Sequence, residues 1–136
     1  MTTISRLAIP EQNPVFGGNT GFNNSKYSPA VEAGGLLFIS GQTGMELDGT
    51  WSADAERQID LAFKRLGEIL RLKDLDFTDL VEIETYHTDI PAHWQTFVAV
   101  KNRYIVQDFP AWTAVGTQLV RPGMIVEIRA VAALKK

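Results

Sequence analysis

The chain has 136 residues, of which 45% are hydrophobic, carries a net charge of −3 at pH 7 and contains no cysteine. This size suits one domain with a substantial core, so we expect a single soluble domain over residues 1–136. The acidic balance offers no general attraction to nucleic acid or to an anionic membrane, and the missing cysteines exclude disulfides and thiol catalysis. With no run of about 18 apolar residues and no signal-peptide core, we expect a cytoplasmic protein without a nucleic-acid or membrane partner.

The N-terminal part of the chain predicts a short strand, a long loop and a hairpin. The strand is expected at residues 4–9. Residues 11–28 are rich in Asn, Gly and Pro, which predicts an irregular loop, and loops of this length in small domains are often functional. Residues 27–31 then lead through a tight Ala-Gly-Gly turn into a buried strand at residues 36–40.

The middle of the chain predicts two amphipathic helices separated by a strand. The first helix begins at a cap formed by Ser52 or Asp54 and ends near residue 72. Its apolar residues recur at helical spacing and belong to the core: Ile59, Ala62, Phe63, Leu66, Ile69 and Leu70. A strand at residues 80–89 follows, and then a second helix at residues 92–106.

The C-terminal sequence predicts an antiparallel pair of strands. They are expected at residues 112–118 and 125–132, joined by a turn in which Pro122 presets the backbone and Gly123 accepts a positive φ. Because side chains alternate along a strand, Glu127 and Arg129 share one face of the last strand. An ion pair between these two side chains is the simpler interpretation, and a pair with a function is the alternative.

This order of elements predicts a two-layer α+β domain, with both helices on one face of a mixed sheet. The opposite face of the sheet would carry a mixture of Glu, Thr, Tyr and apolar side chains. Such a face is too apolar to stay fully solvated, so we expect the chain to associate with copies of itself.

Two segments resemble the RidA family, also called YjgF/YER057c/UK114 or endoribonuclease L-PSP. The stretch YSPAVEAGGLLFISGQTG is similar to the family's Tyr-Ser-x-Ala-Val strand and Ser-Gly-Gln strand end. The stretches FPAWTAVG and VEIRAVAAL resemble its Pro-Ala-Arg-Ser segment and its Glu-Ile-Glu-Ala strand. The resemblance covers about residues 22–134 and implies a chorismate-mutase-like fold in a homotrimer, with small-molecule pockets between subunits.

The family resemblance also implies an activity, the hydrolysis of reactive enamines or imines to a ketoacid and ammonia. A guanidinium holds the substrate carboxylate in such a pocket, and a glutamate orients or deprotonates the attacking water. Glu127 matches the water-positioning glutamate. The matching substrate-binding positions in this chain are Tyr27, Ser40, Gly41, Trp112, Thr113, Ala114 and Arg129. The resemblance implies no cofactor and no metal.

The chain departs from the family pattern at positions that matter for function. Trp112 stands where the arginine is expected, Arg129 where a second glutamate is expected, and Val98 where the second helix commonly carries an asparagine. A tryptophan offers one N–H and a large apolar face, so it cannot form a bidentate salt bridge. Losing that charged contact would cost on the order of 2–5 kcal/mol of binding to a carboxylate.

Three functional hypotheses follow from this pattern. The chain is a divergent enzyme for an uncharged or aromatic substrate, with Glu127 as general base and Trp112 as a stacking wall. Alternatively, it is a non-catalytic binder of a small metabolite or partner. In the third, Arg129 or Arg121 supplies the anion contact from a new position.

The ribonuclease activity that the family label suggests is less favoured by the residues. The basic residues are scattered, and the chain is acidic overall. His87 and His93 are the two histidines, and with Pro91 between them we do not expect a metal site.

Overall fold

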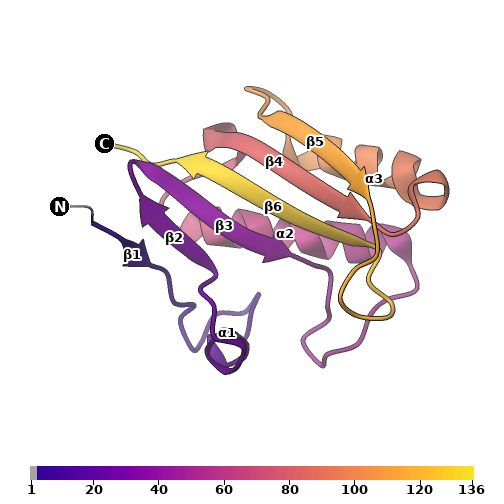
Figure 1. Cartoon of the computed structure of the whole chain (residues 1–136), viewed down its shortest axis with the longest axis horizontal. Helices are drawn as coiled ribbons and strands as arrows, with labels where there is room; N and C mark the ends of the chain where they lie inside the picture. The colour runs from indigo at the N-terminus through magenta and orange to yellow at the C-terminus, as the bar shows by residue number, and fades with distance from the viewer. Residues whose placement is uncertain (1–2) are drawn as a thin grey trace.

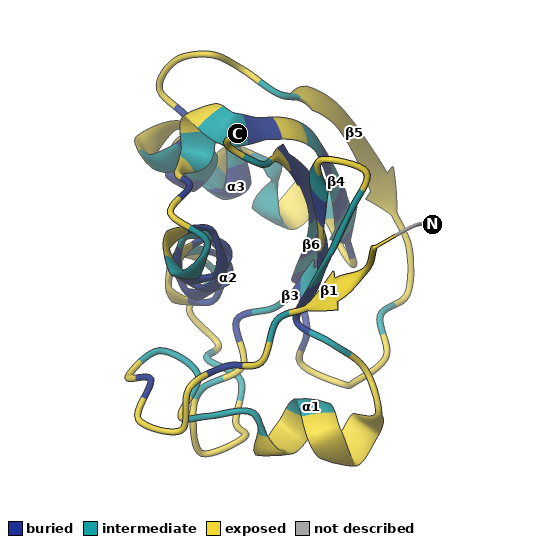
Figure 2. Cartoon of the chain, turned by 90° about the vertical axis from the view of Figure 1, so that its left-hand side faces the viewer, coloured by how far each residue is buried: buried dark blue, intermediate teal, exposed yellow. Residues whose placement is uncertain are grey.

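The computed structural model describes residues 3–136, which form one six-stranded mixed sheet with two long helices packed on one face (Figures 1 and 2). The strands are β1 Ser5–Arg6, β2 Ala30–Ala33, β3 Leu36–Gln42, β4 Leu80–His87, β5 Ala111–Gly116 and β6 Val126–Ala133. The helices are α1 Thr20–Ser25, α2 Ala55–Leu72 and α3 Ile90–Tyr104, with a 3₁₀ turn at Phe77–Asp79. The predicted two-layer α+β architecture is confirmed.

The order of strands across the sheet is β1-β2-β3-β6-β4-β5. β6 lies between β3 and β4 and is antiparallel to both, whereas β5 runs parallel to β4 at the edge. The predicted C-terminal hairpin is therefore wrong, because its two strands are not neighbours. The central position suits β6, whose apolar side chains at Val126, Ile128, Ala130 and Ala132 are buried against the helices.

Local signals define the two long helices, but α3 begins at Ile90 and not at residue 92, and the strand before it ends at His87 and not at residue 89. The Asp54 side chain accepts a hydrogen bond from the backbone N–H of Glu56 at 3.0 Å and caps α2. Asp89 caps α3 in the same way, and Pro91 lies in the first turn of that helix, where its missing N–H costs nothing. The helices bury their apolar residues against the sheet, with Phe63 and Phe97 fully enclosed.

The segment before β2 is more ordered than the predicted irregular loop, because it contains the short helix α1. Asparagine side chains hold it in place. Asn19 accepts a hydrogen bond from the N–H of Ile9 at 2.8 Å, and Asn13 accepts from the N–H groups of Val15 and Phe16 at 3.0 Å each. Asn and Gly in this segment therefore mark defined turns.

Within residues 3–136, no helix combines the length and the apolar character needed to cross a bilayer.

Candidate functional site

Tyr27, Gly41 and Glu127 lie together on the sheet face opposite the helices. Glu127 projects outward because its strand neighbours Val126 and Ile128 point into the core. A Cβ atom on Gly41 would lie only 2.7 Å from the Cδ and Oε2 atoms of Glu127. Gly41, in the irregular end of β3, therefore makes room for the carboxylate. The pKa of Tyr27 is raised by its burial and also by the nearby charge of Glu127.

The Glu127 carboxylate is half-buried, and no cation in the described part of the chain pairs with it. Burial raises the pKa of Glu127 above its usual range. Within residues 3–136, no Lys, Arg or His lies within ion-pair distance of it. Arg129 instead places Nη1 3.6 Å from a carboxylate oxygen of each of Glu82 and Glu84 on β4. The predicted ion pair between Glu127 and Arg129 is therefore wrong.

Ser40 joins β3 to the segment that carries Tyr27. Its Oγ donates a hydrogen bond to the carbonyl of Ser28 at 2.7 Å, and its N–H donates to the carbonyl of Pro29 at 3.0 Å. These bonds place the tyrosine beside the end of β3, so Ser40 positions this group of residues.

Trp112 lies on the other face of the sheet, under α3. Its indole stacks on that of Trp94, with ring centroids 5.4 Å apart and an interplanar angle of 8°. It also contacts Phe97, with centroids 6.1 Å apart. Two aromatic side chains of α3, Trp94 and Phe97, thus pack against the indole. Within one chain, Trp112 and Glu127 do not share a pocket.

A buried polar chain holds the indole in place. The Nε1–H of Trp112 donates to Oγ1 of Thr85 at 3.0 Å, and Thr85 Oγ1 is 2.8 Å from Nε2 of His87. Thr85 and His87 are 0% and 2% exposed. Burial lowers the pKa of His87, which favours the neutral imidazole. His87 therefore belongs to the core.

The two residues after Trp112 are divided between the faces of the sheet. Ala114 shares the helix face with Trp112, whereas Thr113 is aligned with Glu84 and shares its outward face. All of β5 is exposed in the single chain. The substrate-binding residues predicted from the sequence thus form two groups, one on each face.

A cavity of about 270 Å³ opens beside Trp112, at the edge formed by α3 and the start of β5. Its lining residues are Ile83, Lys101, Asn102, Ile105, Phe109, Pro110 and Trp112. Nζ of Lys101 lies 4.8 Å from the centroid of the Trp112 ring. Lys101 was not among the site residues expected from the sequence, although it lies four residues after Phe97, the spacing that places two side chains on one helix face.

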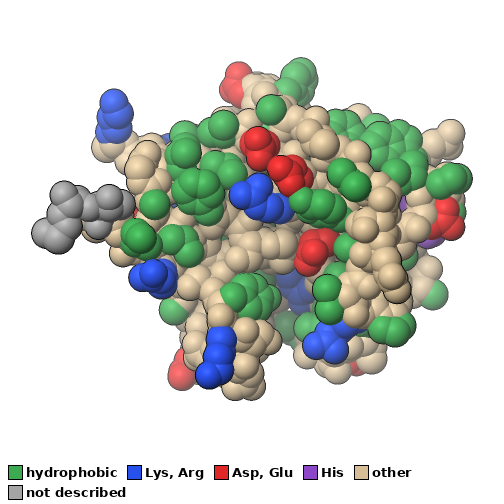
Figure 3. All heavy atoms as spheres, viewed as in Figure 1, with side chains coloured by type: hydrophobic (Ala, Val, Ile, Leu, Met, Phe, Trp, Pro, Cys, Tyr) green, Lys and Arg blue, Asp and Glu red, His purple; other side chains and the backbone are tan. Residues whose placement is uncertain are grey.

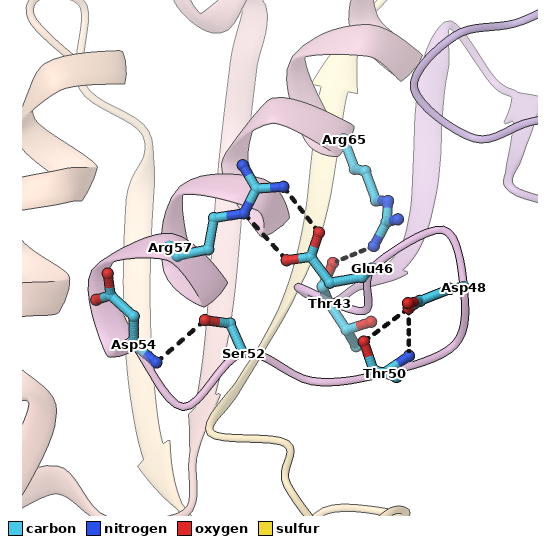
Figure 4. A network of polar contacts seen from close by, with 8 residues as sticks. All are labelled: Thr43, Glu46, Asp48, Thr50, Ser52, Asp54, Arg57 and Arg65. Carbon is cyan, nitrogen blue, oxygen red and sulfur yellow. Dashed lines mark hydrogen bonds and ion pairs between the residues drawn. The ribbon is translucent and has the colours of Figure 1, made fainter.

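A smaller cavity, of about 190 Å³, lies beside Tyr27 and Gly41 and is also lined by Arg65. Arg65 is buried, and its Nη1 donates to the carbonyl of Thr43 at 3.0 Å (Figure 4). Its Nε is fully enclosed and has no partner among residues 3–136, so a ligand has no access to that atom. Arg65 therefore holds the loop between β3 and α2, together with the Arg57–Glu46 ion pair at 2.7 Å.

Comparison with known proteins agrees with the fold and with the motifs in the sequence. Residues 22–134 match the family model described as Endoribonuclease L-PSP. The chain is 34% identical over 125 residues to the RutC family protein YjgH of Escherichia coli (strain K12), covering 90% of this chain and 95% of YjgH. It is 32% identical over 108 residues to the human 2-iminobutanoate/2-iminopropanoate deaminase, covering 78% of each.

A solved structure indicates the same family. The crystal structure of Rv2704 from Mycobacterium tuberculosis, described as a member of the YjgF/YER057c/UK114 family, matches with a TM-score of 0.75 and 27% identity. The match covers 96% of this chain and 100% of that one. The chain belongs to the endoribonuclease L-PSP family, also named YjgF/YER057c/UK114, as the sequence motifs predict.

Proposed function

We propose that the protein is a RidA-type hydrolase of a reactive enamine or imine, other than the small carboxylate imines, and that neighbouring subunits of a homotrimer build its site. One observation carries this proposal. The half-buried Glu127 carboxylate lies beside Tyr27, in space left by Gly41, and has no cationic partner within residues 3–136. A similar human protein is named as an imine deaminase.

The need for more than one subunit follows from the two faces of the sheet. Glu127 lies on the outer face and Trp112 under α3, so a site that contains both needs a second chain. β5 is an exposed edge strand, and Phe38 and Val115 on the outer face are 39% and 40% exposed. Figure 3 shows this face, where hydrophobic side chains surround a small charged group. Exposed edges and apolar patches of this kind are typical of surfaces that associate.

Glu127 is suited to activate water in such a site. In the proposed reaction its carboxylate takes a proton from water as the oxygen bonds to the C=N carbon, and the electron pair of the double bond moves to nitrogen. Glu127 returns this proton to the nitrogen, which gives a carbinolamine, and transfer of the hydroxyl proton to the nitrogen with cleavage of the C–N bond then releases ammonia and leaves a carbonyl. The raised pKa of Tyr27 keeps its hydroxyl protonated at neutral pH, so it is available as a donor.

The alternative is a non-catalytic, metabolite-binding trimer. The observation that favours it is the fixed Trp112, whose indole supplies no guanidinium and whose N–H is already bonded to Thr85. Ribonuclease activity is not favoured by the outer face, where Glu82, Glu84 and Glu127 surround a single Arg129 on β4 and β6. Arg129 is also a poor substitute anion clamp, because two carboxylates already pair with it.

The test measures ammonia release from imines made in situ by an amino-acid oxidase acting on leucine, phenylalanine and alanine. We expect release above the enzyme-free background, greater for the two large apolar imines than for that of alanine. Glu127→Ala should abolish the acceleration. Gly41→Ala should do so too, because its new Cβ displaces the carboxylate.

Glu56→Ala, which removes an exposed carboxylate from the first turn of α2, is the matched control and should keep full activity. No acceleration by the native protein with any of the three imines would favour the binding alternative. Full activity of Glu127→Ala would show that Glu127 is not the base.

A further inference from the structure

The cavity beside Trp112 is lined mostly by apolar side chains. Ile83, Ile105, Phe109 and Pro110 contribute hydrocarbon surface, while Lys101 and its neighbour Asn102 supply the polar groups. Its volume of about 270 Å³ is just below the range for small-molecule pockets, roughly 300–1,000 Å³. The cavity therefore suits a small ligand that is mostly apolar.

The indole of Trp112 forms a wall of this cavity but offers no free hydrogen-bond donor. Its single N–H is bonded to Thr85, and its ring is stacked on Trp94. Because the indole is held by both contacts, it presents a fixed apolar surface. Any charge on the ligand has to be met by another residue.

Lys101 is the cation at this wall. Its Nζ donates one hydrogen bond, to Oδ1 of Asn102 at 2.9 Å, out of the three that an ammonium can make. Among residues 3–136, no carboxylate lies within ion-pair distance of Lys101. Burial lowers its pKa, which indicates a partly desolvated ammonium, and a charge in such surroundings interacts more strongly with an anion than one in water.

The sequence offered Arg129 or Arg121 for the anion contact, and the structure adds Arg65, which lines the cavity beside Tyr27. Arg121 is exposed in the segment between β5 and β6. Arg129 pairs with Glu82 and Glu84. Arg65 is enclosed and bonded to the carbonyl of Thr43. Lys101 differs from Arg129 because no carboxylate in the described part of the chain pairs with it, and from Arg65 because it lies against Trp112, where the family pattern places its arginine.

We propose that Lys101 binds the carboxylate of the ligand and that this ligand is a small acid with a large apolar or aromatic side chain, which packs against Trp112 and Phe109. The inference rests on the proposed function, because it names the substrate class of that site: 2-imino acids of large apolar amino acids. Lys101 then supplies from α3 the positive charge that β5 lacks at Trp112.

The test is equilibrium binding by titration calorimetry, with phenylacetate as the acid and phenylacetamide as its uncharged counterpart. The proteins are the native chain, Lys101→Met, Lys101→Arg and the control Lys64→Met, which removes an exposed lysine from α2. We expect Lys101→Met to weaken phenylacetate binding about tenfold or more, while Lys101→Arg and Lys64→Met stay within a few-fold of native. Phenylacetamide should bind weakly to the native chain and be insensitive to Lys101→Met.

Three results would overturn the inference: no binding of phenylacetate by the native protein, equal binding of acid and amide, or native-like affinity in Lys101→Met. Thermal melts of each variant show that the fold is intact, and Lys101→Arg tests the charge even if Lys101→Met is unstable. The binding assay is independent of turnover. If phenylacetate binding depends on Lys101 but no ammonia is released, the proposed hydrolase is wrong and this inference holds. If ammonia is released equally by the native protein and Lys101→Met, the hydrolase holds and this inference is wrong.

Discussion

The polar groups on the two faces of the sheet differ in whether they have partners. Under α3, the N–H of Trp112, the hydroxyl of Thr85 and the ring of His87 form a closed chain in which each group has a partner. On the outer face, Glu127 is half-buried in a space that Gly41 leaves open, and none of the cations at residues 3–136 pairs with it. Buried polar groups are nearly always paired where a protein needs only stability. The difference indicates that the hydrogen-bonded chain from Trp112 to His87 stabilises the fold, while Glu127 is a reactive group kept for a ligand.

The largest effect on stability is expected from Trp112→Ala. This change removes the stack on Trp94 and leaves Thr85 and His87 without the indole N–H. Because the side chain is 37% exposed, we expect a loss of about 2–4 kcal/mol, below the full cost for a buried tryptophan. Urea unfolding measures it, and a loss below about 0.5 kcal/mol would mean that the stack does not support the fold.

Thr85→Val tests the buried polar chain with almost no change in shape. The valine leaves both the Trp112 N–H and the His87 nitrogen unpaired, which should cost about 1–3 kcal/mol in urea unfolding. Thr113→Val is the matched control, since Thr113 is exposed on the next strand, and it should change stability by less than about 0.5 kcal/mol. Equal effects of the two changes would contradict the closed chain.

The pH dependence of unfolding tests His87. Burial lowers its pKa in the folded protein, so below the unfolded value of about 6.5 the unfolded chain binds more protons than the folded one. This part of the stability is present above that pH and is lost as the pH falls towards the folded pKa. The urea midpoint should therefore decrease between about pH 7.5 and pH 5.5, and less so in His87→Gln.

His93→Gln is the control for this measurement and should show the native pH dependence, because His93 lies outside the buried chain. If His87→Gln kept the full native dependence, the titrating group would be another residue.

The smallest effect, of opposite sign, is expected from Glu127→Gln. Burial raises the pKa of Glu127, so its carboxylate form destabilises the fold as the pH rises through the folded pKa. The neutral amide should raise the melting temperature slightly at neutral pH. The corresponding gain in the free energy of unfolding should be less than about 1 kcal/mol. The gain should vanish below about pH 4, where the glutamate is protonated in both states. A loss of stability at neutral pH would indicate that the carboxylate serves the fold.

Local chemistry in the sequence determined much of this protein. The Asp54 cap, the hairpin of β2 and β3, the alternation that places Glu127 and Arg129 on one face, and the family motifs all depend on residues close together in the chain. Helix caps, turns and strand alternation are short-range effects, so they can be read without coordinates.

The tertiary structure decided which strands became neighbours. Alternation shows which residues share a face of one strand, but it does not show which strand lies beside it. Placing β6 between β3 and β4 gave Arg129 its partners on β4 and separated Glu127 from Trp112. Packing of α3 over β5 brought Lys101 to the indole. These contacts join residues distant in sequence, and burial of the whole apolar face selects them together.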